Sequence, residues 1–149
     1  MNYLSLALIA FAAGAAIATQ ASLNAQLGVL LRSPLLATAV AFFSGLIFTL
    51  IACAAMVKNL PNVETLKAVP HYLWFSGGLL STFGIATFYW LIPKMGIGPM
   101  LSYALAGQLI LAMLAGHFGW FQLPVIPIST LKLVGVLSLI LGIVFINNG

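Results

Sequence analysis

The sequence predicts an all-α membrane protein with five transmembrane helices, and three observations support this. Charged residues make up 4% of the 149 residues and apolar residues 63%, whereas a soluble domain carries about a quarter charged residues. Five apolar stretches are each long enough to cross a hydrocarbon core of roughly 30 Å. The breaks between them carry turn residues. We therefore expect a single five-helix domain, residues 1–149, embedded in a lipid bilayer.

The expected spans are residues 4–31, 35–57, 72–92, 98–120 and 130–147. The first is expected to be an uncleaved helix, because no basic segment precedes its apolar run. All seven prolines fall in or beside the breaks, so we expect none inside a span. Pro99 is expected in the first turn of the fourth helix, a position that proline favours.

Positive charge in the short loops does not choose one orientation strongly. An odd number of spans puts the termini on opposite sides, with Lys58, Lys67 and Lys132 on the amino-terminal side and Arg32 and Lys94 on the other. Such charges orient membrane proteins, and here the two sides differ by one. Two alternatives stay open: one orientation with the amino terminus inside, or both orientations and an antiparallel homodimer.

The stretch GAAIATQASLNAQLG, residues 14–28, places three carboxamides in the first span. Gln20 and Asn24 lie one helical turn apart and share a face. They fall about 4 Å and about 10 Å from the middle of the span, at about 1.5 Å per residue. Gln26 points elsewhere and lies further out. Hydrocarbon cannot satisfy amide groups, so Gln20 and Asn24 are expected to face protein or a polar cavity.

Further polar candidates lie in the third and fourth spans. Gln108 belongs to a row of small residues, Ala104, Gln108, Ala112 and Gly116, and such rows let membrane helices approach closely. Ser81 stands in a similar row with Gly77, and Tyr103 lies slightly inside the fourth span. Two interpretations remain for the amides. They hold helices together, or they line a solute site at mid-membrane, where transporters place substrate.

Aromatic residues and one histidine mark the ends of the third and fourth spans. Aromatic side chains favour the headgroup region, so five are interpreted as interface anchors: Tyr72, Trp74, Tyr89, Trp90 and Trp120. His117 is the one ionisable side chain expected inside a span. Histidine titrates near neutral pH, so His117 is either a proton relay or a neutral interfacial residue.

The residues that are missing exclude several classes of function. Glu64 is the single acidic residue, so no intramembrane carboxylate is expected to exchange protons for a cation. No metal-ligand cluster, phosphate loop or nucleophile–base pair is found, and the scattered cations form no nucleic-acid patch. We expect neither an enzyme, nor a bound metal, nor a cofactor.

Three stretches carry a resemblance to a known family: AAGAAIATQASLNAQLG, SGGLLSTFGI and ALAGQLILAMLAGHFGWFQLPVIPIS. The chain resembles, over nearly its whole length, the small YdcZ-like bacterial inner-membrane exporters of the drug/metabolite transporter superfamily. This resemblance implies a five-helix unit equal to one inverted-repeat half of a ten-helix transporter. Two such units would pair as an antiparallel homodimer, or with an oppositely oriented paralogue. Relatives often carry an acid just before His-Phe-Gly, where this chain has Gly116.

These observations lead to one main functional hypothesis and two rivals. The main hypothesis is export of a small polar or zwitterionic solute by alternating access in an antiparallel dimer. Its proposed solute contacts are Gln20, Asn24, Ser81, Tyr103 and Gln108, with His117 as the proton relay candidate. One rival is a passive dual-topology ion channel. The other is a non-transporting assembly or regulatory membrane subunit.

Overall fold

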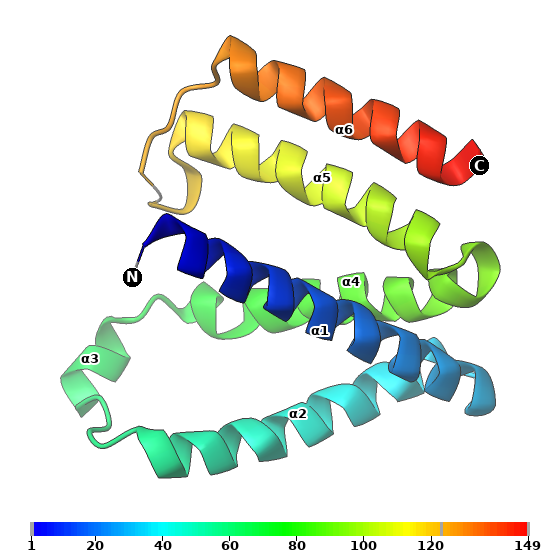
Figure 1. Ribbon diagram of the computed structural model, residues 1–149. Coiled ribbons are helices and arrows are strands. Elements are labelled where there is room, and N and C mark those ends of the chain that lie inside the picture. The colour runs from blue at the N-terminus through cyan, green and yellow to red at the C-terminus, as the bar shows by residue number, and fades with distance from the viewer. Residues whose placement is uncertain (1, 123, 149) are drawn as a thin grey trace. The chain divides into compact units, whose positions relative to one another are not determined.

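The computed structural model describes residues 2–122 and 124–148 and is built from helices (Figure 1). Five of the described helices are long and apolar enough to cross a membrane. They are α1 (Tyr3–Leu30), α2 (Pro34–Met56), α4 (His71–Met95), α5 (Ile97–Phe118) and α6 (Thr130–Asn148). The predicted all-α fold with five transmembrane helices is therefore confirmed.

The described structure differs from the sequence prediction in three respects beyond shifts of a single residue at helix ends. The loop after α2 contains a short helix, α3 (Val63–Ala68), because the side chain of Asn62 caps it by accepting a hydrogen bond from the backbone N–H of Thr65 at 2.8 Å. The prediction that no proline lies inside a helix is wrong, because α4 continues through Pro93 to Met95. Two helical residues, Lys94 and Met95, follow this proline. Trp120 lies beyond α5, in a short 3-10 turn, η1 (Trp120–Gln122).

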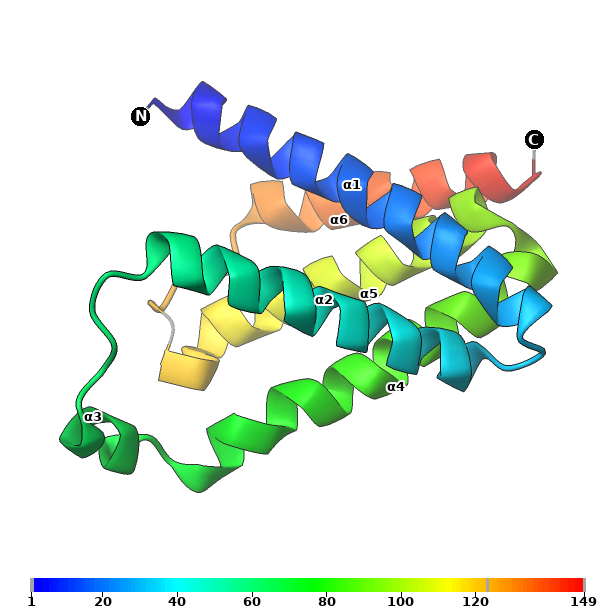
Figure 2. The same cartoon turned by 90° about the horizontal axis from the view of Figure 1, so that it is seen from below.

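The chain divides into two compact units, residues 1–94 and 95–149, and each is described by itself. In the first unit, α1 and α2 are antiparallel and lie closest near the turn that joins them. The buried residues there are small: Ala21, Ala25 and Gly28 on α1, and Ala37 and Thr38 on α2. Away from that turn the two helices diverge (Figures 1 and 2).

Gly28 allows the closest approach between α1 and α2. A Cβ atom added to it would lie 3.4 Å from Cα of Pro34 and 3.5 Å from Cβ of Ala37. Ala21, Ala25 and Gly28 follow one another at helical spacing and therefore form one face. Small residues along such a face let membrane helices pack backbone against backbone. This packing fixes the orientation of the α1 face that carries the polar residues described below.

The turn from α1 to α2 is a Schellman motif with an unusual residue. The backbone N–H of Ser33 donates to the carbonyl of Gly28 at 2.9 Å, and the N–H of Arg32 donates to the carbonyl of Val29 at 3.1 Å. Arg32 adopts φ 53°, in the left-handed region where such motifs usually place glycine. Ser33 then caps α2, accepting from the N–H of Leu36 at 3.3 Å, and Pro34 opens the helix.

The second unit is a hairpin of two antiparallel helices, α5 and α6, which lie side by side (Figure 1). Helix α5 ends at Gly119, which adopts φ 64° and whose N–H donates to the carbonyl of Ala115. Pro99 falls in the first turn of α5, as expected. Ala115 on α5 and Ile143 on α6 are buried.

Most large apolar side chains are exposed, for example Phe11 (79%) and Phe83 (74%). Hydrocarbon tails are as apolar as these side chains, so this exposure suits a chain surrounded by lipid. Small-residue faces are open as well. In its own unit, no atom lies within 4 Å of a Cβ added to Gly14, Gly77, Gly78 or Gly116. These faces are therefore free for another helix to pack against.

Candidate solute-binding site

Gln20, Asn24 and Tyr89 form one hydrogen-bonded network in the first unit. Nδ2 of Asn24 donates to Oε1 of Gln20 at 2.8 Å. The phenol of Tyr89, on α4, donates to the same Oε1 atom at 3.1 Å. Tyr89 is 1% exposed, while the two carboxamides are half-buried. The network therefore joins two helices through a single amide oxygen.

Helical geometry explains why Gln20 and Asn24 meet and Gln26 does not join them. Residues four apart on a helix are neighbours on its surface, and the Gln20–Asn24 hydrogen bond confirms the common face expected from the sequence. Gln26 is exposed. Ala21 follows Gln20, Ala25 follows Asn24, and both alanines are buried. The polar pair therefore borders the packed face of α1.

The network leaves a defined set of polar groups free. Oε1 of Gln20 already accepts two hydrogen bonds, which satisfies both of its lone pairs. Both N–H groups of the Gln20 amide, one N–H of Asn24 and the Oδ1 atom of Asn24 have no partner within the described residues. Among those residues, no fully buried side-chain nitrogen or oxygen lacks a hydrogen bond. The free groups therefore reach accessible space, where they offer three donors and one principal acceptor.

A pocket of about 230 Å³ adjoins the network at the end of the unit where α1, α2 and α4 converge. Tyr89 belongs to the network and also lines the pocket. Two cationic side chains, Arg32 and Lys94, also line it. Nζ of Lys94 lies 3.4 Å from the centre of the Trp90 ring, a cation–π contact. The remaining lining residues are Gly28, Val29, Pro34 and Pro93.

Of the other predicted contact residues, one lies in the first unit and two lie in the second. Ser81 lies on α4, about two turns before Tyr89, and is exposed. Gln108 and Tyr103 lie on α5 in the second unit and are also exposed. Their role as solute contacts, and the association of Gln108 with Gln20, stay predictions.

A comparison with protein-family models decides the family. The model described as "Putative inner membrane exporter, YdcZ" matches residues 5–145. The chain belongs to this family. No significant match is found among curated proteins or solved structures.

As a YdcZ-family member with five helices that can span a bilayer, the chain is a multi-pass protein of the inner membrane. The family description is that of an exporter, which indicates a transporter rather than an enzyme. A transporter of this kind requires a lipid bilayer and a small-molecule solute, the two partners expected from the sequence.

In this YdcZ-family chain, His117 is held by the loop that follows α5. Its Nδ1 atom accepts a hydrogen bond from the backbone N–H of Ile128 at 3.2 Å. In this arrangement Nδ1 acts as a hydrogen-bond acceptor. The carbonyl of Gly116 accepts from the N–H of Ile126 at 2.8 Å. These bonds give His117 a structural role, and its role as a proton relay stays a prediction.

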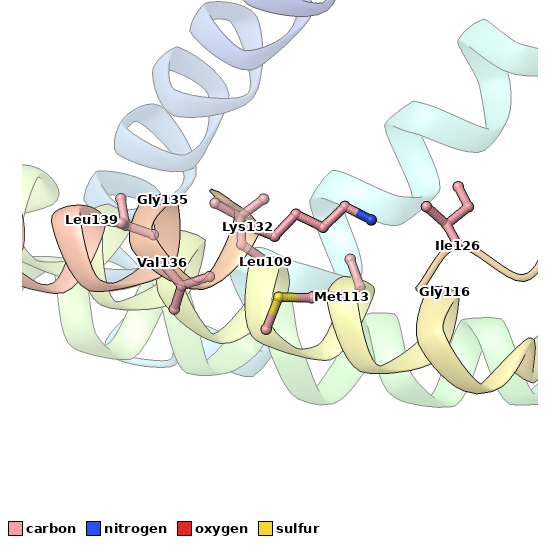
Figure 3. A pocket seen from close by; sticks show the side chains of 9 residues that line it. Leu109, Met113, Gly116, Ile126, Lys132, Gly135, Val136 and Leu139 are labelled. Atoms are coloured by element: carbon pink, nitrogen blue, oxygen red, sulfur yellow. The ribbon is translucent and has the colours of Figure 1, made fainter. Parts of the chain in front are cut away.

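A second pocket, of about 330 Å³, lies between α5 and α6 and is almost wholly apolar (Figure 3). Leu109 and Met113 line it from α5, and Val136 and Leu139 line it from α6. Lys132 contributes the cation, but its Nζ atom donates to the carbonyl of Pro127 at 2.9 Å. This pocket offers a solute few polar contacts, so the amide network is the better candidate site.

The prediction that Tyr89 is an interface anchor is wrong. The anchor interpretation suits Trp90, which is 50% exposed, but not Tyr89, which is buried and bonded to Gln20. Tyr89 and Gln20 are 69 residues apart, and no local pattern pairs them. The small face at Ala21, Ala25 and Gly28 was the available signal, because it shows which side of α1 packs closely.

Proposed function

We propose that this protein exports a small polar or zwitterionic solute by alternating access, as an antiparallel homodimer. The observation that carries the proposal is the Tyr89–Gln20–Asn24 network, which holds free amide groups at an accessible position inside an apolar helix. If the two amides served only to join helices, we would expect their N–H groups to donate to other protein groups. Here the free N–H groups of Gln20 and Asn24 are available to a solute.

The polar groups of the network are neutral, and this limits the solute class. Amides recognise carbonyl, hydroxyl, carboxylate and amine groups by hydrogen bonding. A solute-binding group near mid-membrane suits transporters, which place their substrates there. The single acidic residue of the chain, Glu64, lies in α3 and outside the transmembrane helices. A solute that depends on an intramembrane carboxylate is therefore not the proposed substrate.

The open small-residue faces support a second, inverted copy. A Cβ atom added to Gly14, Gly77, Gly78 or Gly116 would meet no atom within 4 Å in its own unit, and small faces are typical of helix–helix interfaces in membranes. The near balance of loop charge permits both orientations. In the proposed dimer, both copies of Gln20 and Gln108 approach the two-fold axis and complete the solute site.

Single cysteines test the antiparallel arrangement. In a Cys53→Ala background, Val63→Cys and Met95→Cys each place a thiol at an exposed position near opposite ends of α4. Gly96 is avoided because its φ of 85° would strain a cysteine. An impermeant thiol reagent should label each variant partly from either side of intact inner-membrane vesicles. Labelling of each from one side only would contradict the homodimer and require an oppositely oriented paralogue.

Flux measurements test transport itself. Purified protein in liposomes should show saturable counterflow of at least one member of a panel of polar and zwitterionic metabolites. Gln20→Leu and Asn24→Leu should abolish it, and Gln26→Leu, at an exposed position of the same helix, is the matched control. Normal flux in Gln20→Leu would show that the amides only pack helices. Passage of thousands of ions per second would instead indicate a channel.

A further inference from the structure

We infer that the pocket lined by Arg32, Lys94 and Tyr89 binds an anionic oxygen group, and that the transported solute carries a carboxylate. The inference rests on the proposed function for the solute, but the pocket itself is tested by binding alone. It adds a charged recognition site to the neutral amide network. The pocket lies within the first unit and holds about 230 Å³, enough for a carboxylate and its neighbouring atoms.

Within the first unit, neither cation of the pocket has an acidic partner. Glu64 is the single acidic residue of the chain. It lies in α3, at the end of the unit opposite the α1–α2 turn (Figures 1 and 2). Lys94 rests on the Trp90 ring instead, with Nζ 3.4 Å from its centre. Two cations beside one cavity, with no carboxylate near them, attract an anion from solution or from the lipid surface.

The backbone of Arg32 gives an independent reason to assign its side chain a task. Arg32 occupies the position of the Schellman motif where glycine is preferred, and its φ of 53° is unfavourable for a residue with a Cβ atom. Glycine would satisfy the same two backbone hydrogen bonds without strain. The side chain of Arg32 is therefore not needed for the turn, and Arg32 is one of the two cationic residues that line the pocket.

Tyr89 connects the charged pocket with the amide network. It lines the pocket, and its hydroxyl donates to Oε1 of Gln20 at 3.1 Å. The free groups beyond it are mainly donors, from Gln20 and Asn24, and donors are what a carboxylate requires. An anionic group would thus meet the two cations at one end of the unit and the amide N–H donors of Gln20 and Asn24 nearer the middle of α1. Both sets of groups are hydrogen-bond donors.

Trp90 provides a direct readout of binding. The chain has three tryptophans, so Trp74→Phe and Trp120→Phe leave Trp90 as the sole tryptophan, which is excited selectively at wavelengths that tyrosine does not absorb. An anion that binds Lys94 would draw its ammonium group from the ring and change the emission. Sodium acetate, titrated at constant ionic strength into this protein in neutral detergent, should give a saturable change. Acetamide, which has nearly the same shape but no charge, should give none.

Substitutions distinguish binding in the pocket from a general effect of the protein's positive charge on the acetate response. Arg32→Gly and Lys94→Met should each weaken the acetate response by about tenfold or more, since each removes a charge-assisted hydrogen bond. Lys58→Met, at the opposite end of α2, is the matched control and should change nothing. Arg32→Gly should fold at least as well as the parent, because glycine suits the left-handed turn. Its loss of response therefore cannot be attributed to unfolding.

Lipid headgroups and solutes offer the same anionic oxygen, and vesicle composition distinguishes them. In vesicles of phosphatidylcholine alone, acetate should act as in detergent. If phosphatidylglycerol in equal amount shifts Trp90 emission by itself and abolishes the acetate response, the pocket is a lipid site and the solute part of the inference is wrong. No saturable response to either anion would overturn the whole inference. The proposed transport of a polar or zwitterionic solute would still be tested independently by the flux measurements.

Discussion

Tyr89 donates its hydroxyl hydrogen to Oε1 of Gln20, 3.1 Å away and 69 residues earlier in the chain. Asn24 donates to the same oxygen, so the Gln20 amide is held in one orientation with its NH₂ group free. The buried tyrosine thus sets which polar groups the first helix presents. Because α1 and α4 are far apart in sequence, this bond also contributes to the tertiary structure of the first unit.

Removing the Tyr89 hydroxyl should lower stability slightly and loosen the network. Hydrogen bonds between membrane helices contribute about 0.6 kcal/mol on average, so Tyr89→Phe should reduce the free energy of unfolding in detergent by about that amount. Tyr103→Phe, at a tyrosine that is 55% exposed, is the control and should have no effect. Equal losses in the two variants would show that the Tyr89 bond is not formed.

Gly28 should tolerate alanine but not a larger residue. Its added Cβ would meet Pro34 and Ala37 at 3.4 and 3.5 Å, an ordinary contact distance, so Gly28→Ala should be nearly neutral. Leucine would push α2 away and should cost about 1–3 kcal/mol, as overpacking usually does. Thermal unfolding in detergent measures this, and Ala12→Leu, at an exposed position on the opposite side of α1, is the control. A fully stable Gly28→Leu variant would contradict the close packing.

Gly119 should not tolerate a side chain. It ends α5 with φ 64°, and a left-handed conformation costs roughly 1–2 kcal/mol for residues other than glycine. Gly119→Ala should therefore lower the unfolding temperature. Gly45→Ala, in the middle of α2 with open space around it, should leave the temperature unchanged or raise it. The opposite order would mean that the α5 turn adopts another conformation in the membrane.

His117 should be replaceable by a residue that keeps its acceptor. The bond from Ile128 N–H to Nδ1 predicts that His117→Leu loses about 1 kcal/mol of stability, typical of a removed hydrogen bond. Asparagine places an oxygen near the position of Nδ1, so His117→Asn should retain most of that stability. Counterflow measured across a range of pH completes the test. An altered pH dependence in His117→Asn would favour the proton-relay role instead.

Much of the fold could be predicted because the membrane restricts it strongly. Hydropathy and turn residues located all five long helices. Pro93 was misjudged because proline disfavours a helix without forbidding it, so composition alone cannot tell whether a helix ends before the proline or continues through it. The helix α3 was missed because it has six residues, too few for a periodic pattern to show.

The candidate site could be predicted in part. Helical spacing alone placed Gln20 and Asn24 on one face, and their hydrogen bond follows from it. The role of Tyr89 depends on which faces of α1 and α4 meet, and that is decided by tertiary packing rather than by local pattern. The pocket at Arg32 and Lys94 depends on the convergence of three helices, and in sequence those cations looked like isolated loop charges.

The position of Arg32 and Lys94 at one end of the first unit has a consequence for the direction of transport. If two identical chains pair in inverted orientation, each membrane face receives one such pocket, with the same residues and the same affinity. Neither face then differs from the other in what it recognises. The assembly would have no inherent direction, and net export would follow from the solute gradient or membrane potential that the cell maintains.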